Sequence, residues 1–270
     1  MKKILTGIIF PILIISFIFL TSCKQRGAEK QQKNTEKEQI ETQIEKNVYP
    51  LPTSAQVIQM LTDLEVGYIF GISNPVENTK KYFTSNRRAI NMGVFGADLS
   101  YATLYNMQQI VLDYLSAINS LSNELNMSKI YNATLYDSIK KNVDNKDALV
   151  RILTGAFNDT YGYLVENDQQ SLALLVVGGA WVEGMYLTTH VSEAAYQVAG
   201  ISGVLLEQKK SFELFLEITK PYANDPSVSD FVAKLDPVKK VYEGLGTSLT
   251  EQNIKDITVA ITAVREQIVQ

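Results

Sequence analysis

The chain has 270 residues, of which 46% are hydrophobic and 20% are charged, with a net charge of −4 at pH 7. This composition suffices for a buried core and excludes collagen-like and wholly disordered chains. A single cysteine excludes an intramolecular disulfide, a single histidine excludes a multi-histidine metal site, and the lack of a basic excess argues against nucleic-acid partners.

The first 23 residues have the layout of an export signal. Lys2 and Lys3 precede an apolar run over 4–20, which is shorter than the roughly 20 residues of a membrane span. The run ends in Leu20-Thr21-Ser22-Cys23, which resembles a bacterial lipobox. The resemblance implies that residues 1–22 are a cleaved signal peptide and that Cys23 carries a covalent lipid, which anchors the chain in a membrane. The alternative is an uncleaved signal anchor in which the cysteine is incidental.

The residues after the cysteine bear on location. In lipoproteins of diderm bacteria, aspartate directly after the cysteine is associated with retention in the inner membrane. Lys24 stands at that position here, so the resemblance implies the outer membrane. The following residues lack the acidic tract of lipoproteins displayed on the cell surface. We therefore expect a domain that faces the periplasm, with surface exposure as the alternative.

A charged tether is predicted over 23–49, including the lipidated cysteine. Residues 24–47 contain six basic and five acidic residues and only three apolar ones, too few to form a core. Ile40, Ile44 and Val48 lie at helical spacing, so the second half is consistent with a helix that has one apolar stripe.

Residues 50–270 are predicted to form one all-α domain. A first helix opens at Pro52 and ends near Gly71, and Asn74 is a predicted N-cap before Pro75. A long helix is predicted over 89–125, with Gly93 and Gly96 as kink points.

Further helical signals follow to the end of the chain. Helices are predicted over 129–143, over 146–166 after an Asn145 cap, over 170–199, up to Pro221, after Asp225 and Asp236, and over 250–269. No segment shows sustained period-two alternation with hairpin turns. A buried strand over 171–177 is the main alternative, but the apolar pattern continues through Trp181 and favours a central helix. The prediction is a single bundle of seven or eight helices, in which Gly178-Gly179 marks a close helix crossing.

The motifs of common enzymes are missing. No nucleophile elbow, P-loop, dinucleotide-binding turn, HExxH helix or EF-hand loop occurs. A triad could assemble around His190, but nothing nominates its serine. The sequence therefore points away from an enzyme. Lys239-Lys240 is predicted to be a solvated face.

Three acidic residues are each followed by a tyrosine one helical turn later. The pairs are Asp98 with Tyr101, Asp159 with Tyr163, and Glu183 with Tyr186. This spacing puts acid and phenol on one helix face, and convergence of the three faces would suit a hard cation or a polyhydroxy or cationic ligand. The alternative is that the tyrosines are half-buried or the acids face water.

The segment Thr188-Thr189-His190-Val191-Ser192-Glu193 resembles the G-x-H-x-x-E motif of imelysin-like proteins, although its leading glycine is missing. These are exported all-α proteins with a metal or peptidase site. The resemblance implies a metal site that uses His190 and Glu193.

Two functions are weighed for the helical domain, which carries a net charge of −7 over residues 48–270. The leading hypothesis is a membrane-anchored envelope lipoprotein that binds a protein partner or a small polar ligand without catalysis. It needs no cofactor besides the lipid on Cys23. The alternative is an imelysin-like protein for metal binding or uptake.

Overall fold

The computed structural model describes residues 67–193 and 201–270, which belong to one structural unit. These residues form α-helices and short 3-10 helices and contain no strand, so the all-α prediction is confirmed. The predicted signal peptide, Cys23, the tether and most of the first predicted helix lie outside the described residues.

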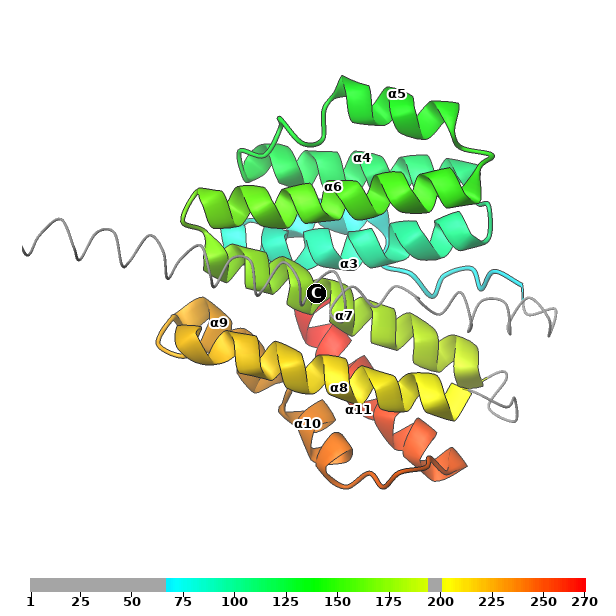
Figure 1. Ribbon diagram of the computed structural model, residues 1–270, viewed down its shortest axis with the longest axis vertical. Helices are drawn as coiled ribbons and strands as arrows, with labels where there is room; N and C mark the ends of the chain where they lie inside the picture. Colours follow the sequence, from blue (N-terminus) through cyan, green and yellow to red (C-terminus); the bar gives the residue numbers. More distant parts are fainter. Residues whose placement is uncertain (1–66, 194–200) are drawn as a thin grey trace, which may run out of the picture. The chain divides into compact units, whose positions relative to one another are not determined.

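The helices follow one another along the chain with short connections (Figure 1). They are η2 (Val76–Lys81), α3 (Ser85–Leu104), α4 (Gln108–Glu124), α5 (Ala133–Lys141), α6 (Lys146–Glu166), α7 (Gln170–Glu193), α8 (Ile201–Thr219), η3 (Lys220–Tyr222), α9 (Pro226–Lys234), α10 (Asp236–Glu243) and α11 (Glu251–Val269). The Asn145 side chain accepts a hydrogen bond from the Ala148 amide, which confirms the predicted cap of α6.

The single long helix predicted over 89–125 is wrong, because the chain turns between α3 and α4. Asn106 has a φ of 55°, and the Met107 amide donates to the Ala102 carbonyl at 2.9 Å, which is the bond that closes a Schellman motif. Asn126 and Asp168 end α4 and α6 in the same way, with φ of 60° and 58°. Asn and Asp take up this left-handed conformation more readily than other non-glycine residues, so they replace the expected glycine.

The segment before α3 also differs from the prediction. Residues 67–71 are not helical, and Gly71 turns the chain with a φ of 81°. Pro75, not Asn74, flanks η2, which is a 3-10 helix of six residues. The Asn74 side chain is fully buried, and its Nδ2 atom donates to the Tyr82 hydroxyl at 3.0 Å.

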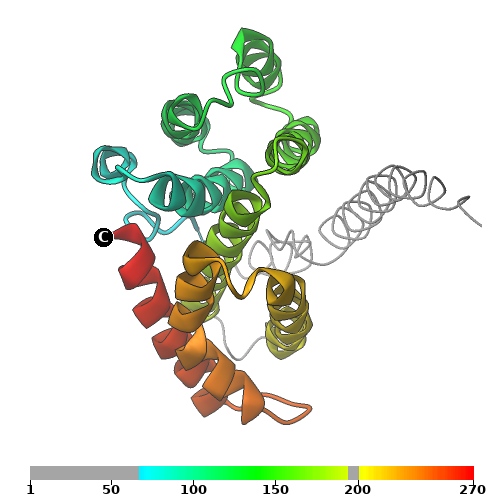
Figure 2. The same cartoon turned by 90° about the vertical axis from the view of Figure 1, so that its left-hand side faces the viewer.

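Helix α7 is the centre of the fold, as the apolar pattern through Trp181 predicts. It contacts α3, α6, α8, α9 and α11, and α11 in turn packs beside α10 (Figure 2). The helix is long and apolar enough to cross a membrane by composition alone, but 83% of that window is buried by the rest of the chain. Residues 171–177 are helical within α7, so the alternative of a buried strand is excluded.

Two glycines allow α3 and α7 to cross in backbone contact. A Cβ atom on Gly93 would lie 2.0 Å from the Val176 carbonyl oxygen, and one on Gly179 would lie 2.0 Å from that of Ile90. The close crossing predicted at Gly178-Gly179 is therefore confirmed. Gly93 serves this contact within α3, which continues from Ser85 to Leu104.

Candidate functional site

A buried ion pair joins α7 to α11. The Glu183 side chain is 0% exposed and that of Arg265 is 12% exposed. The Arg265 guanidinium donates to both carboxylate oxygens, from Nε to Oε2 at 2.7 Å and from an Nη to Oε1 at 2.8 Å. The Arg265 Cζ atom also lies 4.0 Å from the centre of the Tyr186 ring. This two-pronged geometry fixes the guanidinium and neutralises its charge.

A second carboxyl group, that of Asp98 on α3, is buried beside this pair. Its Oδ2 atom accepts a hydrogen bond from the backbone N–H of Asn74 at 3.2 Å, whereas Oδ1 has no partner in the described part of the chain. Burial and then the charge of Glu183 raise the pKa of Asp98 well above its ordinary value, and Arg265 offsets this only in part.

One arginine cannot neutralise two buried carboxylates. Burial beside Glu183 therefore favours the protonated form of Asp98, and we expect its O–H to be directed toward Glu183. With Asp98 in that form, the acid–arginine cluster, as we call Asp98, Glu183 and Arg265, has no net charge.

The cluster holds the chain segment that precedes α3. An Nη of Arg265 donates to the Ile72 carbonyl at 3.3 Å, while the Tyr114 hydroxyl donates to the Asn74 carbonyl at 3.0 Å. The Ile69 amide donates to the Tyr101 hydroxyl at 3.0 Å. These bonds satisfy backbone groups that no regular secondary structure pairs. The cluster, together with Tyr101 and Tyr114, attaches residues 69–74 to α3, α4 and α11.

The predicted ligand residues are only partly brought together. Asp98 and Glu183 are both buried, and the Tyr186 ring packs against Arg265, the partner of Glu183. The Tyr101 hydroxyl accepts a hydrogen bond from the Ile69 amide. Asp159 is exposed on α6, so it is not part of the buried cluster. The Tyr163 hydroxyl donates to the Asn126 carbonyl at 3.0 Å, which links α6 to the turn after α4.

His190 lies at the end of α7 against Tyr186. Its Nδ1 atom is 2.8 Å from the Tyr186 carbonyl oxygen, and the two ring centres are 3.9 Å apart. The side chain of Glu193 lies outside the described residues. Among the residues that are described, no group of three His, Cys, Asp or Glu side chains could hold a metal ion.

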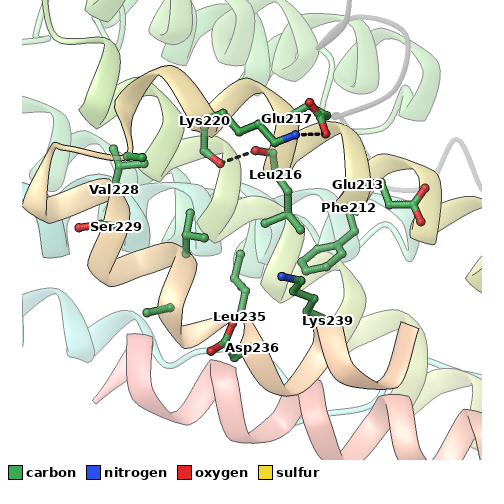
Figure 3. A pocket seen from close by; sticks show the side chains of 14 residues that line it. Phe212, Glu213, Leu216, Glu217, Lys220, Val228, Ser229, Leu235, Asp236 and Lys239 are labelled. Atoms are coloured by element: carbon green, nitrogen blue, oxygen red, sulfur yellow. Dashed lines mark hydrogen bonds and ion pairs between the residues drawn. The ribbon is translucent and has the colours of Figure 1, made fainter. Parts of the chain in front are cut away.

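A groove between α8, η3, α9 and α10 has a volume of about 590 Å³ (Figure 3). We call it the α8–α10 groove. Its floor is apolar and its rim is charged. The floor includes Phe212, Leu216, Val228, Val232 and Leu235, and the rim Glu213, Glu217, Lys220, Asp236 and Lys239.

Sequence reasoning missed this groove. The sequence predicts a solvated face for both Lys239 and Lys240, whereas in the structure only Lys239 of the two lines the groove. No local pattern distinguishes the two lysines, because the distinction arises from how α10 packs against its neighbours.

No known protein family, curated protein or solved structure matches the chain. Function is therefore argued from the groove, the acid–arginine cluster and the sequence motifs.

Proposed function

We propose that the chain is a lipid-anchored envelope protein whose helical domain binds a partner or ligand without catalysis. The α8–α10 groove carries the proposal, because its volume of about 590 Å³ lies within the range of roughly 300–1,000 Å³ typical of ligand sites. The acid–arginine cluster supports it indirectly. Its carboxyl groups are fully buried, and hydrogen bonds join that of Glu183 to Arg265 and that of Asp98 to the segment before α3, so they are poorly placed to act on a substrate.

The anchor is proposed from the lipobox-like residues that end in Cys23. Metabolic labelling with a palmitate analogue, followed by membrane fractionation, tests it. We expect the wild-type chain to be labelled and to sediment with the outer membrane, and a Cys23→Ser chain to lose the label. Equal labelling of both chains would contradict the anchor.

Affinity capture from envelope fractions with the lipid anchor intact tests the binding role. Ala233 is exposed and lines the groove, so Ala233→Trp obstructs it. Ala263 is exposed on α11 outside the groove, so Ala263→Trp is the matched control. We expect a partner that Ala263→Trp retains and Ala233→Trp loses. A partner retained equally by both would place the binding surface elsewhere, and the absence of any retained component would count against a binding role.

A metal-handling role like that of imelysin-like proteins is the second proposal. One observation favours it, namely that the contact of His190 Nδ1 with the Tyr186 carbonyl resembles the support that metal-binding histidines receive. Nε2 is then the nitrogen that would face a metal. Metal analysis of purified wild-type and His190→Ala protein tests the role, and equal metal content in both would reject it.

A further inference from the structure

The floor of the α8–α10 groove belongs to the rigid core of the domain. Phe212 is buried, and its ring centre lies 5.0 Å from that of Trp181 on α7 and 5.5 Å from that of Tyr242 on α10. Leu235 and Val228 are also buried. An apolar ligand on this floor would therefore meet a preformed surface, which lowers the entropic cost of binding.

Of the two lysines on the rim, only Lys239 lacks an ionic partner among the residues that the structure describes. Lys220 pairs with Glu217 at 2.5 Å, whereas Lys239 has no ion pair with any described residue. Figure 3 shows the Lys239 ammonium directed inward toward Leu216 and Leu235.

The two remaining acids of the rim compete little for this ammonium. The Glu213 carboxylate points away from Leu216 in Figure 3. Asp236 also lines the groove, three residues before Lys239 on α10, but forms no ion pair with it. The groove thus combines an apolar floor with an ammonium at its edge that forms no ion pair with a described residue.

We propose that the α8–α10 groove binds a single-chain amphipathic carboxylate of the fatty-acid class, with its acyl chain over Phe212 and Leu216 and its head group at Lys239. The inference rests on the proposed binding function and names the chemistry of the ligand. An ammonium at the edge of an apolar floor is complementary to a carboxylate on an alkyl chain.

The single tryptophan provides the assay. Trp181 lies directly behind Phe212, so a dansyl group bound in the groove would receive energy from it. We expect saturable energy transfer from Trp181 to dansyl-undecanoate on titration, and displacement of the probe by palmitate. Hexadecanol should displace it less effectively, since it lacks the charge. A lack of saturable transfer, or displacement by dodecyltrimethylammonium as effective as that by palmitate, would overturn the proposal.

Two pairs of variants locate the head group and the chain. Lys239→Gln should weaken dansyl-undecanoate binding by about five- to tenfold, as expected for the loss of a charge-assisted contact. Lys240→Gln, on the adjacent exposed residue outside the groove, should not change it. Ala233→Trp should abolish binding, and Ala263→Trp should leave it intact. Equal affinities within either pair would overturn the assignment, and the lysine pair decides alone if Ala233→Trp does not fold.

The capture experiment separates this inference from the proposed function. If fatty acids fail to bind but a partner is still lost in Ala233→Trp, the ligand class is wrong and the binding function stands. If neither a fatty acid nor a partner binds, both fail.

Discussion

Replacing Asp98 with asparagine tests the protonated carboxyl group in the acid–arginine cluster. The Asp98→Asn side chain keeps an oxygen for the Asn74 amide and provides an N–H donor toward Glu183, as a protonated carboxyl does. We therefore expect the free energy of unfolding at pH 7 to change by less than about 1 kcal/mol.

Removing the charge of Glu183 should have a much larger effect. The Glu183→Gln change keeps the size of the side chain but removes the carboxylate that binds the Arg265 guanidinium, only 12% exposed, through both oxygens, so that Asp98 would have to ionise in the core to replace its charge. Breaking a buried pair in this way costs about 3–5 kcal/mol. The contrast between the two near-isosteric variants is therefore at least about 2 kcal/mol.

The pH dependence of the free energy of unfolding provides an independent test of the protonation of Asp98. Because the pKa of Asp98 in the folded chain is raised above its ordinary value of 3.8, the folded state binds more protons than the unfolded state between those two pKa values. This contribution is complete below 3.8 and is lost as the pH rises through the folded pKa. Its slope reaches about −1.4 kcal/mol per pH unit, and Asp98→Asn should remove it.

Urea unfolding, followed by circular dichroism from about pH 5 to pH 9, measures both effects, and the difference between wild type and Asp98→Asn cancels all other titrating groups. The reasoning is refuted if Asp98→Asn loses about 3 kcal/mol at pH 7 and leaves the pH slope unchanged. That result would mean that Asp98 is ionised in the folded chain and that its charge is needed.

Five further substitutions test three local features of the fold, each by urea unfolding. Gly93→Ala should cost about 1–3 kcal/mol or more by overpacking α3 against α7, whereas Gly96→Ala, which meets no atom within 4 Å, should be neutral or stabilising; equal effects would contradict the close crossing. Asn106→Ala should cost about 1 kcal/mol because of its positive φ, and Asn106→Gly should not; equal stability of both would refute the assigned turn. Asp225→Ala should cost about 1 kcal/mol by removing the cap of α9. Because hydrogen bonds from Ser171 and Ser227 lower the pKa of Asp225 to about 2, this stabilisation is present above its ordinary value of 3.8 and is lost as the pH falls through about 2; a loss that persists unchanged below that pH would contradict the assignment.

Local signals predicted most of the helices. The Asn145 cap located the start of α6, and the Asp-Pro pairs marked the short helices near the C-terminus. The turn after α3 escaped prediction because asparagine at position 106 takes a left-handed conformation that local sequence does not distinguish from a helical one. The proline after Asn74 predicts a helix cap at this residue, whereas its backbone N–H donates a hydrogen bond to Asp98 on α3.

The candidate sites depended on contacts that no local pattern encodes. Spacing along each helix identified Asp98 and Glu183, but their neutralising partner Arg265 lies 82 residues after Glu183 and has no distinctive sequence context. Asp159 shares the same local pattern and faces solvent, since the helix pattern does not specify which polar face becomes buried. The α8–α10 groove arises from the packing of separate helices, so only the tertiary structure distinguishes Lys239 from Lys240.

The most direct test of the fatty-acid site in the α8–α10 groove is a titration with dansyl-undecanoate, followed by energy transfer from Trp181. The Lys239→Gln and Lys240→Gln chains are measured in parallel. We expect saturable binding to the wild-type and Lys240→Gln chains and binding about five- to tenfold weaker to Lys239→Gln. Equal affinities of all three chains, or no saturable transfer in any of them, would contradict a fatty-acid site in the α8–α10 groove.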